Sequence, residues 1–198
     1  MTPEQFINQQ LKNKLAKMKR YINSTAPRIA GQIAVNHVRA DFRKGGLTNN
    51  GFHQWPMTKR QQSGGSSASA QYGPLLSGRN HLMNSITAQP GEGHVRIYTD
   101  VPYASVHNFG GILRPKVTAK MRKFAWAMFY KETGYKKGKK QQRTNGKGDQ
   151  WKALALTKKT QLSVRIPQRQ FLPQKPAPEL MQKIEQRIDK DLMKIIQA

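Results

Sequence analysis

The apolar residues near both ends of the chain repeat at the spacing of an α-helix, and this pattern restricts the fold more than any other feature. Residues 3–22 form one amphipathic stretch. A second stretch begins near Pro27 and ends at Gly45-Gly46, which predicts either two helices or one helix with a kink at Pro27. The last stretch, residues 178–197, predicts a closing helix whose inner face consists of Leu180, Ile184, Ile188, Leu192 and Ile195.

The centre of the chain consists of shorter segments separated by Gly and Pro. Residues 85–88 and 94–99 predict a β-hairpin, because apolar and polar side chains alternate from Val95 to Thr99. A short helix is expected from Pro102 to Phe109, capped by Asp100 and ended by Gly110 and Gly111. A helix over residues 118–132 and a second hairpin, formed by residues 151–157 and 161–166, complete the prediction.

These segments together predict an α+β fold. We expect a small antiparallel sheet of about four strands, packed by the N- and C-terminal helices and carrying a basic helix-loop insertion. The predicted division is an N-terminal helical arm (1–46), an α+β core (47–177) with the insertion at 112–160, and a C-terminal helix (178–198).

Positive charge is the dominant feature of the composition, with 35 Lys and Arg against 10 Asp and Glu, a formal net charge of +25. Residues 112–160 contain fifteen basic and two acidic groups, net +13, which is about half of the total. A charge of this size predicts an anionic partner such as nucleic acid or an acidic protein surface, and says nothing about the fold.

Several classes of protein are excluded by what the sequence lacks. It contains no Cys, so disulfides and thiolate metal sites are excluded. No run of about 18 apolar residues is present, so we expect no membrane partner. The first residues lack the apolar stretch of a signal peptide, so synthesis and assembly in the cytoplasm of a host bacterium are expected.

Candidate catalytic groups do not form a recognisable pattern. The five His have no i, i+4 pair, the acidic residues are few and scattered, and no Gly-rich phosphate loop is present. His107 is expected to make structural hydrogen bonds rather than to bind a ligand. We therefore predict a protein that is not an enzyme and has no catalytic, cofactor or metal site.

The basic segment 131–160 allows two interpretations. It is either a solvated loop that keeps the protein soluble or a surface that contacts DNA or an acidic subunit. No helix-turn-helix, zinc finger or RNA-binding aromatic motif accompanies it. The residues that would make such a contact are Lys136, Lys137, Lys139, Lys140, Arg143 and Lys147.

Four segments occur in an order that resembles a known family. They are Trp55-Pro56, GPLLSGRNHLMNSI at 73–86, VRIYTDVPYASVHNFGG at 95–111 and IPQRQFLP at 166–173. This arrangement is similar to that of the virion morphogenesis, or tail-completion, proteins of Mu-like phages. The chain departs from the family at Gln168, where Ala is common, and at Gln170, where Pro is common. Residues 112–160 are also longer than in the simplest members.

Each of the last two segments has a physical interpretation. The short helix in YASVHNFGG needs tertiary contacts to be stable, and in IPQRQFLP we expect Arg169 to point outward while Phe171 and Leu172 anchor the chain. Core packing is favoured over direct partner contact for both. The candidate structural or interface residues are Trp55, Tyr103, His107, Phe109, Gly110, Gly111, Arg169 and Phe171.

The resemblance implies a structural virion protein of a tailed phage, located in the neck or at the head-proximal end of the tail and needed for head–tail joining. It implies a cyclic homo-oligomer, with a hexamer favoured and a dodecamer second, that contacts other neck and tail proteins. The alternative is a basic nucleic-acid-binding protein of a phage or mobile element, which contacts the DNA backbone. The charge supports this alternative, and the lack of a base-reading motif weakens it.

Overall fold

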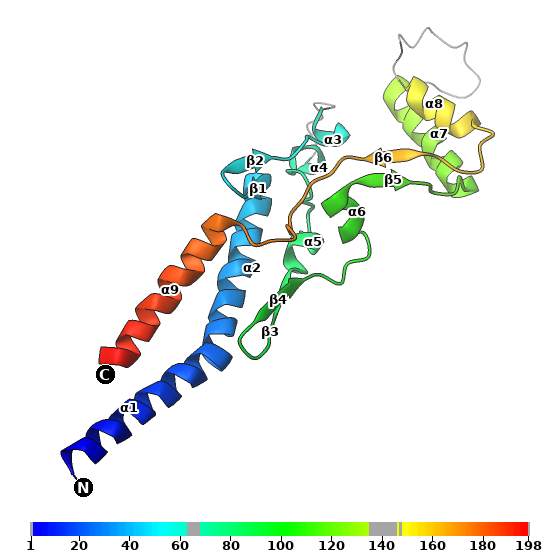
Figure 1. Cartoon of the computed structure of the whole chain (residues 1–198). Coiled ribbons are helices and arrows are strands. Elements are labelled where there is room, and N and C mark those ends of the chain that lie inside the picture. Colours follow the sequence, from blue (N-terminus) through cyan, green and yellow to red (C-terminus); the bar gives the residue numbers. More distant parts are fainter. Residues whose placement is uncertain (1, 63–67, 135–145, 147, 198) are drawn as a thin grey trace. The chain divides into compact units, whose positions relative to one another are not determined.

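A computed structural model describes residues 2–62, 68–134, 146 and 148–197 (Figure 1). The chain divides into two compact units. The main unit is formed by residues 1–110 and 167–198, and the insertion unit by residues 111–166. No helix in the described part of the chain is long and apolar enough to cross a membrane.

The main unit begins with helices α1 (Pro3–Arg20) and α2 (Ala26–Lys44). Thr2 and Gln5 form a capping box at the start of α1, in which each side chain accepts a hydrogen bond from the backbone N–H of the other residue. A single π-helical turn, η1 (Tyr21–Thr25), joins the two helices. Pro27 has no N–H to continue the hydrogen-bond ladder, so the irregularity falls close to the predicted kink.

Helix α2 ends at Gly45, which has a φ of 76° and donates its N–H to the Asp41 carbonyl over 2.9 Å. A hairpin of β1 (Gly46–Thr48) and β2 (Phe52–Gln54) follows. Buried Asp41 fastens this hairpin to α2, because its carboxylate accepts hydrogen bonds from the backbone N–H and the hydroxyl of Thr48 over 2.8 and 2.6 Å. Strands β1 and β2 were not predicted, since strands of three residues are too short to show a period.

The predicted central hairpin is present as β3 (Thr87–Pro90) and β4 (Val95–Tyr98). Gly31 of α2 allows the helix to approach this hairpin closely, because a Cβ atom there would lie 2.8 Å from the Cβ of Ala88. The short helices before the hairpin are α3 (Lys59–Gln62), α4 (Ala68–Gln71) and α5 (His81–Asn84). The core collects side chains from these elements and from the C-terminal segment: Val38, Phe42, Trp55, Leu82, Met83, Ile86, Val101, Ala104 and Phe171.

The predicted short helix is α6 (Ala104–Phe109). Asp100 does not cap it, contrary to our prediction, because a turn intervenes in which Ala104 donates its N–H to the carbonyl of Val101 over 2.9 Å. The residue at the cap position is Tyr103, whose side chain makes no capping hydrogen bond.

The insertion unit consists of the ribbon β5 (Gly111–Leu113) with β6 (Val164–Ile166), and the helices α7 (Ala119–Thr133) and α8 (Asp149–Leu156). Residues 151–157 were predicted to be a strand, and that prediction is wrong. Ala and Leu favour helix, and the helical form buries Ala155 and brings Trp151 edge-on to Phe124 of α7, with ring centroids 5.8 Å apart. Consequently β6 pairs with the distant β5.

The described residues form three separate antiparallel pairs of strands rather than one sheet of about four strands. The closing helix α9 (Pro178–Gln197) agrees with its predicted bounds. It packs against α2 and α1, where Asp191 accepts a hydrogen bond from the Tyr21 hydroxyl over 3.1 Å. The face that was predicted to point inward is half-buried rather than fully buried.

Candidate functional site

The segments that carry the family resemblance meet within the main unit. Residues 55–57, residues 107–110 of α6 and its end, and residues 168–172 are joined by hydrogen bonds, and we call this region the motif junction. Its geometry accounts for why these distant segments occur together in one sequence.

Asn108 is the centre of the motif junction. Its side chain is 5% exposed, and its Oδ1 accepts hydrogen bonds from the backbone N–H groups of Phe171 and Leu172, each over 2.9 Å. Its Nδ2 donates to the carbonyl of Leu172 over 3.0 Å, and its own carbonyl accepts a bond from the Gln168 side chain. One amide therefore satisfies three backbone groups of the C-terminal segment, because Asn offers both donors and acceptors.

Arg169 makes the second connection. Its Nε donates to the carbonyl of Pro56 over 2.9 Å and its guanidinium to that of Met57 over 3.2 Å, while its backbone N–H donates to the His107 carbonyl over 2.8 Å. Only 5% of Arg169 is exposed, so the prediction that it points outward is wrong. The guanidinium offers several N–H donors in a fixed geometry, and two backbone carbonyls accept bonds from it. Burial lowers the pKa of this guanidinium.

Aromatic rings fill the interior beside these bonds. Phe42 lies between Trp55 and Phe171, with ring centroids 5.4 and 5.2 Å away. The Trp55 indole N–H donates to the carbonyl of Gln170 over 2.8 Å, which gives this buried ring a polar partner. Trp55 and Phe171 therefore have the core role that was favoured for the family segments.

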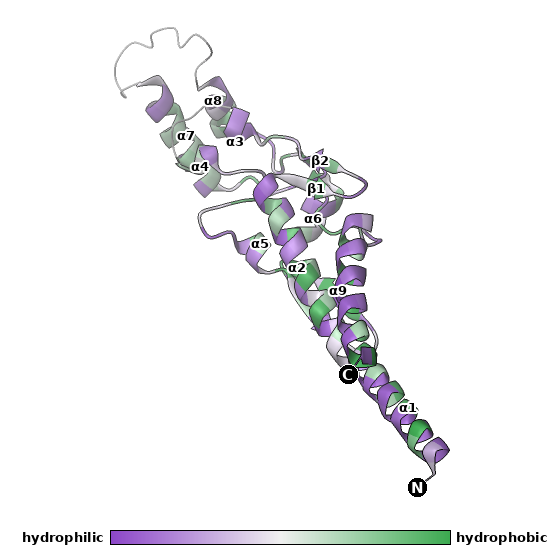
Figure 2. Ribbon diagram, turned by 90° about the vertical axis from the view of Figure 1, so that its left-hand side faces the viewer, coloured by the Kyte–Doolittle hydropathy of each residue, from purple (hydrophilic) through white to green (hydrophobic). Residues whose placement is uncertain are grey.

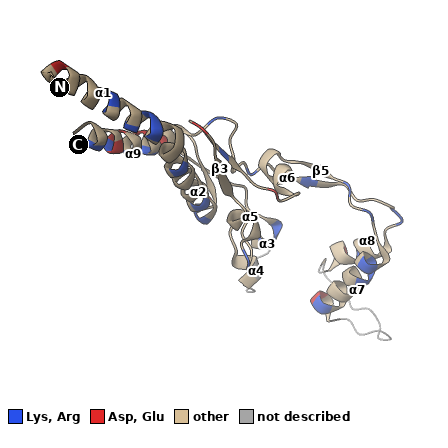
Figure 3. Cartoon of the chain, turned by 90° about the horizontal axis from the view of Figure 1, so that it is seen from below, with Lys and Arg blue, Asp and Glu red and all other residues tan. Residues whose placement is uncertain are grey.

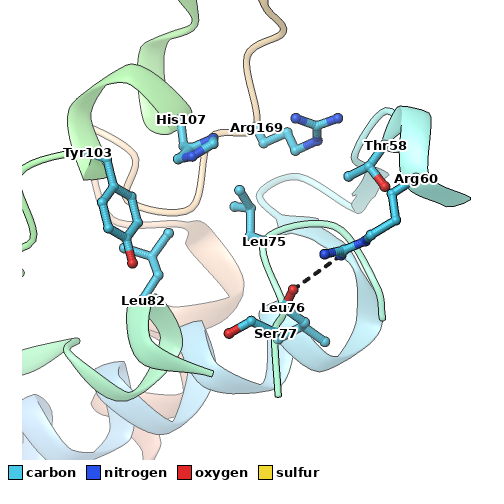
Figure 4. A pocket seen from close by; sticks show the side chains of 9 residues that line it. All are labelled: Thr58, Arg60, Leu75, Leu76, Ser77, Leu82, Tyr103, His107 and Arg169. Carbon is cyan, nitrogen blue, oxygen red and sulfur yellow. Dashed lines mark hydrogen bonds between the residues drawn. The ribbon is translucent and has the colours of Figure 1, made fainter. Parts of the chain in front are cut away.

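A pocket of about 320 Å³ opens beside the motif junction (Figure 4). Tyr103 and His107 line one side, and the Tyr103 hydroxyl lies 3.0 Å from Nδ1 of His81. Burial, and to a lesser degree the charge of Arg169, lower the pKa of His107. The residues that line the pocket are Thr58, Arg60, Leu75, Leu76, Ser77, Leu82, Tyr103, His107 and Arg169, a set without a carboxylate.

The two arginines of the pocket donate to the backbone of the same chain. Arg60 donates to the carbonyls of Tyr72 and Leu76, and Arg169 to those of Pro56 and Met57. These hydrogen bonds hold together the loops that surround the pocket. The hydroxyl–imidazole contact described at its edge is that of Tyr103 with His81, and the described residues include no group of three or more side chains that could bind a metal ion. His107 differs from our expectation of structural hydrogen bonds, because its buried Nδ1 has no hydrogen-bond partner among the described residues.

The remaining predicted residues follow one another at the end of α6. Gly110 has a φ of 72°, and a Cβ atom there would lie 3.0 Å from the backbone N of Gln168, so the chain requires glycine at this position. Phe109 is 57% exposed and lies outside the core. Gly111 begins β5 in the insertion unit and is exposed.

The predicted anionic-partner contact cannot be placed, because Lys136, Lys137, Lys139, Lys140, Arg143 and Lys147 lie outside the described residues. The role of Asn108 in the motif junction was not predicted from the sequence. The available signal was an Asn inside a short helix immediately before Phe-Gly-Gly, a position where a polar side chain needs tertiary partners.

The chain matches a known protein family. The phage virion morphogenesis family matches residues 7–197, a range that includes every segment of the motif junction. The chain therefore belongs to the phage virion morphogenesis family, which confirms the resemblance at the level of the family. No significant match to the chain was found among curated proteins or among solved structures.

Proposed function

We propose that this protein is a non-enzymatic structural component of a tailed-phage particle, located in the neck or at the head-proximal end of the tail and needed to join heads to tails. The match to the family over residues 7–197 carries the proposal. The hydrogen bonds of the motif junction support the structural role in this proposal, because the side chains of Asn108 and Arg169 bond to the backbone of the same chain.

The protein would act as a cyclic homo-oligomer, with six subunits favoured and twelve second, because the neck and tail of a phage particle have cyclic symmetry. The large apolar surface of α1 supports self-association: Phe6, Ile7, Leu11 and Leu15 are each more than half exposed. Soluble monomers rarely expose a large contiguous apolar patch without a binding function.

Particle counting in lysates tests the proposed role. A phage that lacks this chain should give separate heads and tails, and supplying the wild-type protein should restore joined particles. The Asn108→Ala variant should restore them less well, because it loosens the motif junction. Normal numbers of joined particles in the absence of the chain would overturn the proposal.

The net charge of +25 supports the alternative of DNA binding, and reversing part of that charge separates the two functions. If the basic segment binds duplex DNA through about six phosphate contacts, the affinity should fall about a thousandfold between roughly 50 and 200 mM salt. Two variants are compared. The first reverses the charge of Lys136, Lys137, Lys139 and Lys140. The matched control, of equal net charge, reverses the exposed Lys116, Lys120, Lys123 and Lys131.

We expect the first variant to impair joining more than the control, while both bind duplex DNA weakly and without sequence preference. Tight binding that distinguishes DNA sequences and disappears only in the first variant would place the nucleic-acid function first.

A further inference from the structure

The N-terminal turns of α1 have an apolar side that no described residue of the chain buries. Ile7, Leu11 and Leu15 follow helical spacing on one side of the helix and are 56, 54 and 63% exposed. Helix α1 contains no buried residue, and hydrophobic and hydrophilic residues alternate along its ribbon (Figure 2). We call residues 3–15 the arm. A helix of this length gains most of its stability from packing, so the arm needs a surface to cover its apolar side.

The same chain contains an apolar groove of about 350 Å³. Its floor comes from α2, one wall from the β3–β4 hairpin and the other from α9. Ile22 and Met181 at its edges are 45 and 37% exposed. The residues that line it are Ile22, Ala26, Pro27, Ala30, Ala34, Gly93, His94, Val95, Ile97, Pro176, Leu180, Met181, Ile184 and Ile188.

Charge does not oppose a contact between the arm's helix and the groove, because the residues that line the groove include no Lys or Arg. Helix α1 contains five basic residues and one acidic residue, net +4. The chain has ten acidic residues, of which four lie on α9 and a fifth, Glu92, lies in the turn between β3 and β4. Figure 3 shows acidic and basic residues together on α9. Because α9 also has four basic residues, its net charge is zero, which makes it one of the least basic surfaces of a strongly basic protein.

The arm cannot reach the groove of its own copy while the helix is intact. Residues 3–44 form one helical path through η1, and α1 extends beyond the β3–β4 hairpin from the end of α2 (Figure 1). Lys14 fixes this direction, because its Nζ donates to the carbonyl of Ile196 at the end of α9 over 2.7 Å. The occupant must therefore come from another molecule.

We propose that the arm of one copy binds in the groove between α2, α9 and the β3–β4 hairpin of the next copy. An amphipathic helix that places its apolar side in a groove is a common mode of recognition. The contact joins two different surfaces, so it repeats from copy to copy and closes into a ring when the rotation allows. This inference specifies the interface for the self-association proposed above and rests on it.

Disulfide cross-linking tests the contact, since the chain contains no Cys and two introduced thiols report only on their own proximity. The full-length Leu11→Cys protein is mixed with the full-length Met181→Cys protein under mild oxidation. We expect a covalent dimer that contains one of each. The control replaces Leu11→Cys by Gln9→Cys, which lies on the opposite side of α1 and should give little product.

The products decide the outcome. Absence of the mixed dimer, or linkage of Leu11→Cys only to itself, would overturn the arm-to-groove contact. A protein carrying both substitutions should give a ladder of linked multimers, and a cross-linked band at the mass of a monomer would equally refute the proposal. Particle counting remains a separate measurement, so the proposed role in joining can hold while this contact fails.

A second measurement uses the energetics of the arm. Leu11→Glu should weaken self-association about tenfold or more in sedimentation experiments, because a large apolar side chain leaves the groove and a charge replaces it. Gln9→Glu makes the same change in charge on the other side of the helix and should leave association nearly unchanged. Equal effects of the two substitutions would show that net charge, and not the arm's apolar side, controls association.

Discussion

Replacing Asn108 by Ala removes the side chain that joins α6 to the C-terminal segment. The N–H groups of Phe171 and Leu172 and the carbonyl of Leu172 lose the bonds of 2.9, 2.9 and 3.0 Å that Asn108 provides. A backbone group left buried without a partner costs about 1–3 kcal/mol. Phe171 is 1% exposed, so its N–H would be left without any partner and the full cost applies. Leu172 is half-buried, so water can replace part of its lost hydrogen bonding.

We therefore expect Asn108→Ala to lower the free energy of unfolding of the main unit by about 2–4 kcal/mol. This is a large part of the roughly 5–15 kcal/mol that holds a typical domain folded. Urea unfolding followed by the fluorescence of Trp55 measures the change, in a background where Trp126 and Trp151 of the insertion unit are replaced by Phe. An unchanged slope with urea confirms that stability alone has changed.

The control is Gln168→Ala, which removes one hydrogen bond of 3.2 Å from an exposed side chain to the Asn108 carbonyl. It should cost about 1 kcal/mol or less. If Asn108→Ala costs no more than this control, the three bonds do not hold the junction together and the central role assigned to Asn108 is wrong.

Three further predictions concern the main unit. Gly110→Ala should cost about 1–3 kcal/mol in thermal unfolding, and more than Gly51→Ala, whose added Cβ meets no atom within 4 Å; equal losses would contradict the close approach. The pKa of His107 is lowered in the folded state, so stability should be complete above about pH 6.5 and fall as the pH decreases. His107→Gln should flatten this dependence in urea titrations, and an unchanged profile would refute it. Ile188→Ala should cost about 1–2 kcal/mol by the same titration, below the roughly 2–5 kcal/mol of a fully buried site, because Ile188 is half-buried; a loss above about 3 kcal/mol would contradict this.

The helices at the two ends were predictable because their signals are local. The spacing of apolar residues, the capping box at Thr2 and the glycine at Gly45 act within a few residues of the backbone that they shape. The same holds for the β3–β4 hairpin, whose turn and alternation lie within a dozen residues. The family resemblance was also readable, since it depends on the order of short segments.

Only the tertiary structure decided which distant groups meet. Strand β5 pairs with β6 across the whole insertion unit, and residues 151–157 are mostly helical because α7 offers them a surface to pack on. Arg169 is buried with its guanidinium bonded to the carbonyls of Pro56 and Met57, more than a hundred residues earlier in the chain. A buried polar side chain requires hydrogen-bond partners, and this much can be predicted from a short segment. Which groups become its partners depends on contacts between residues far apart in the sequence.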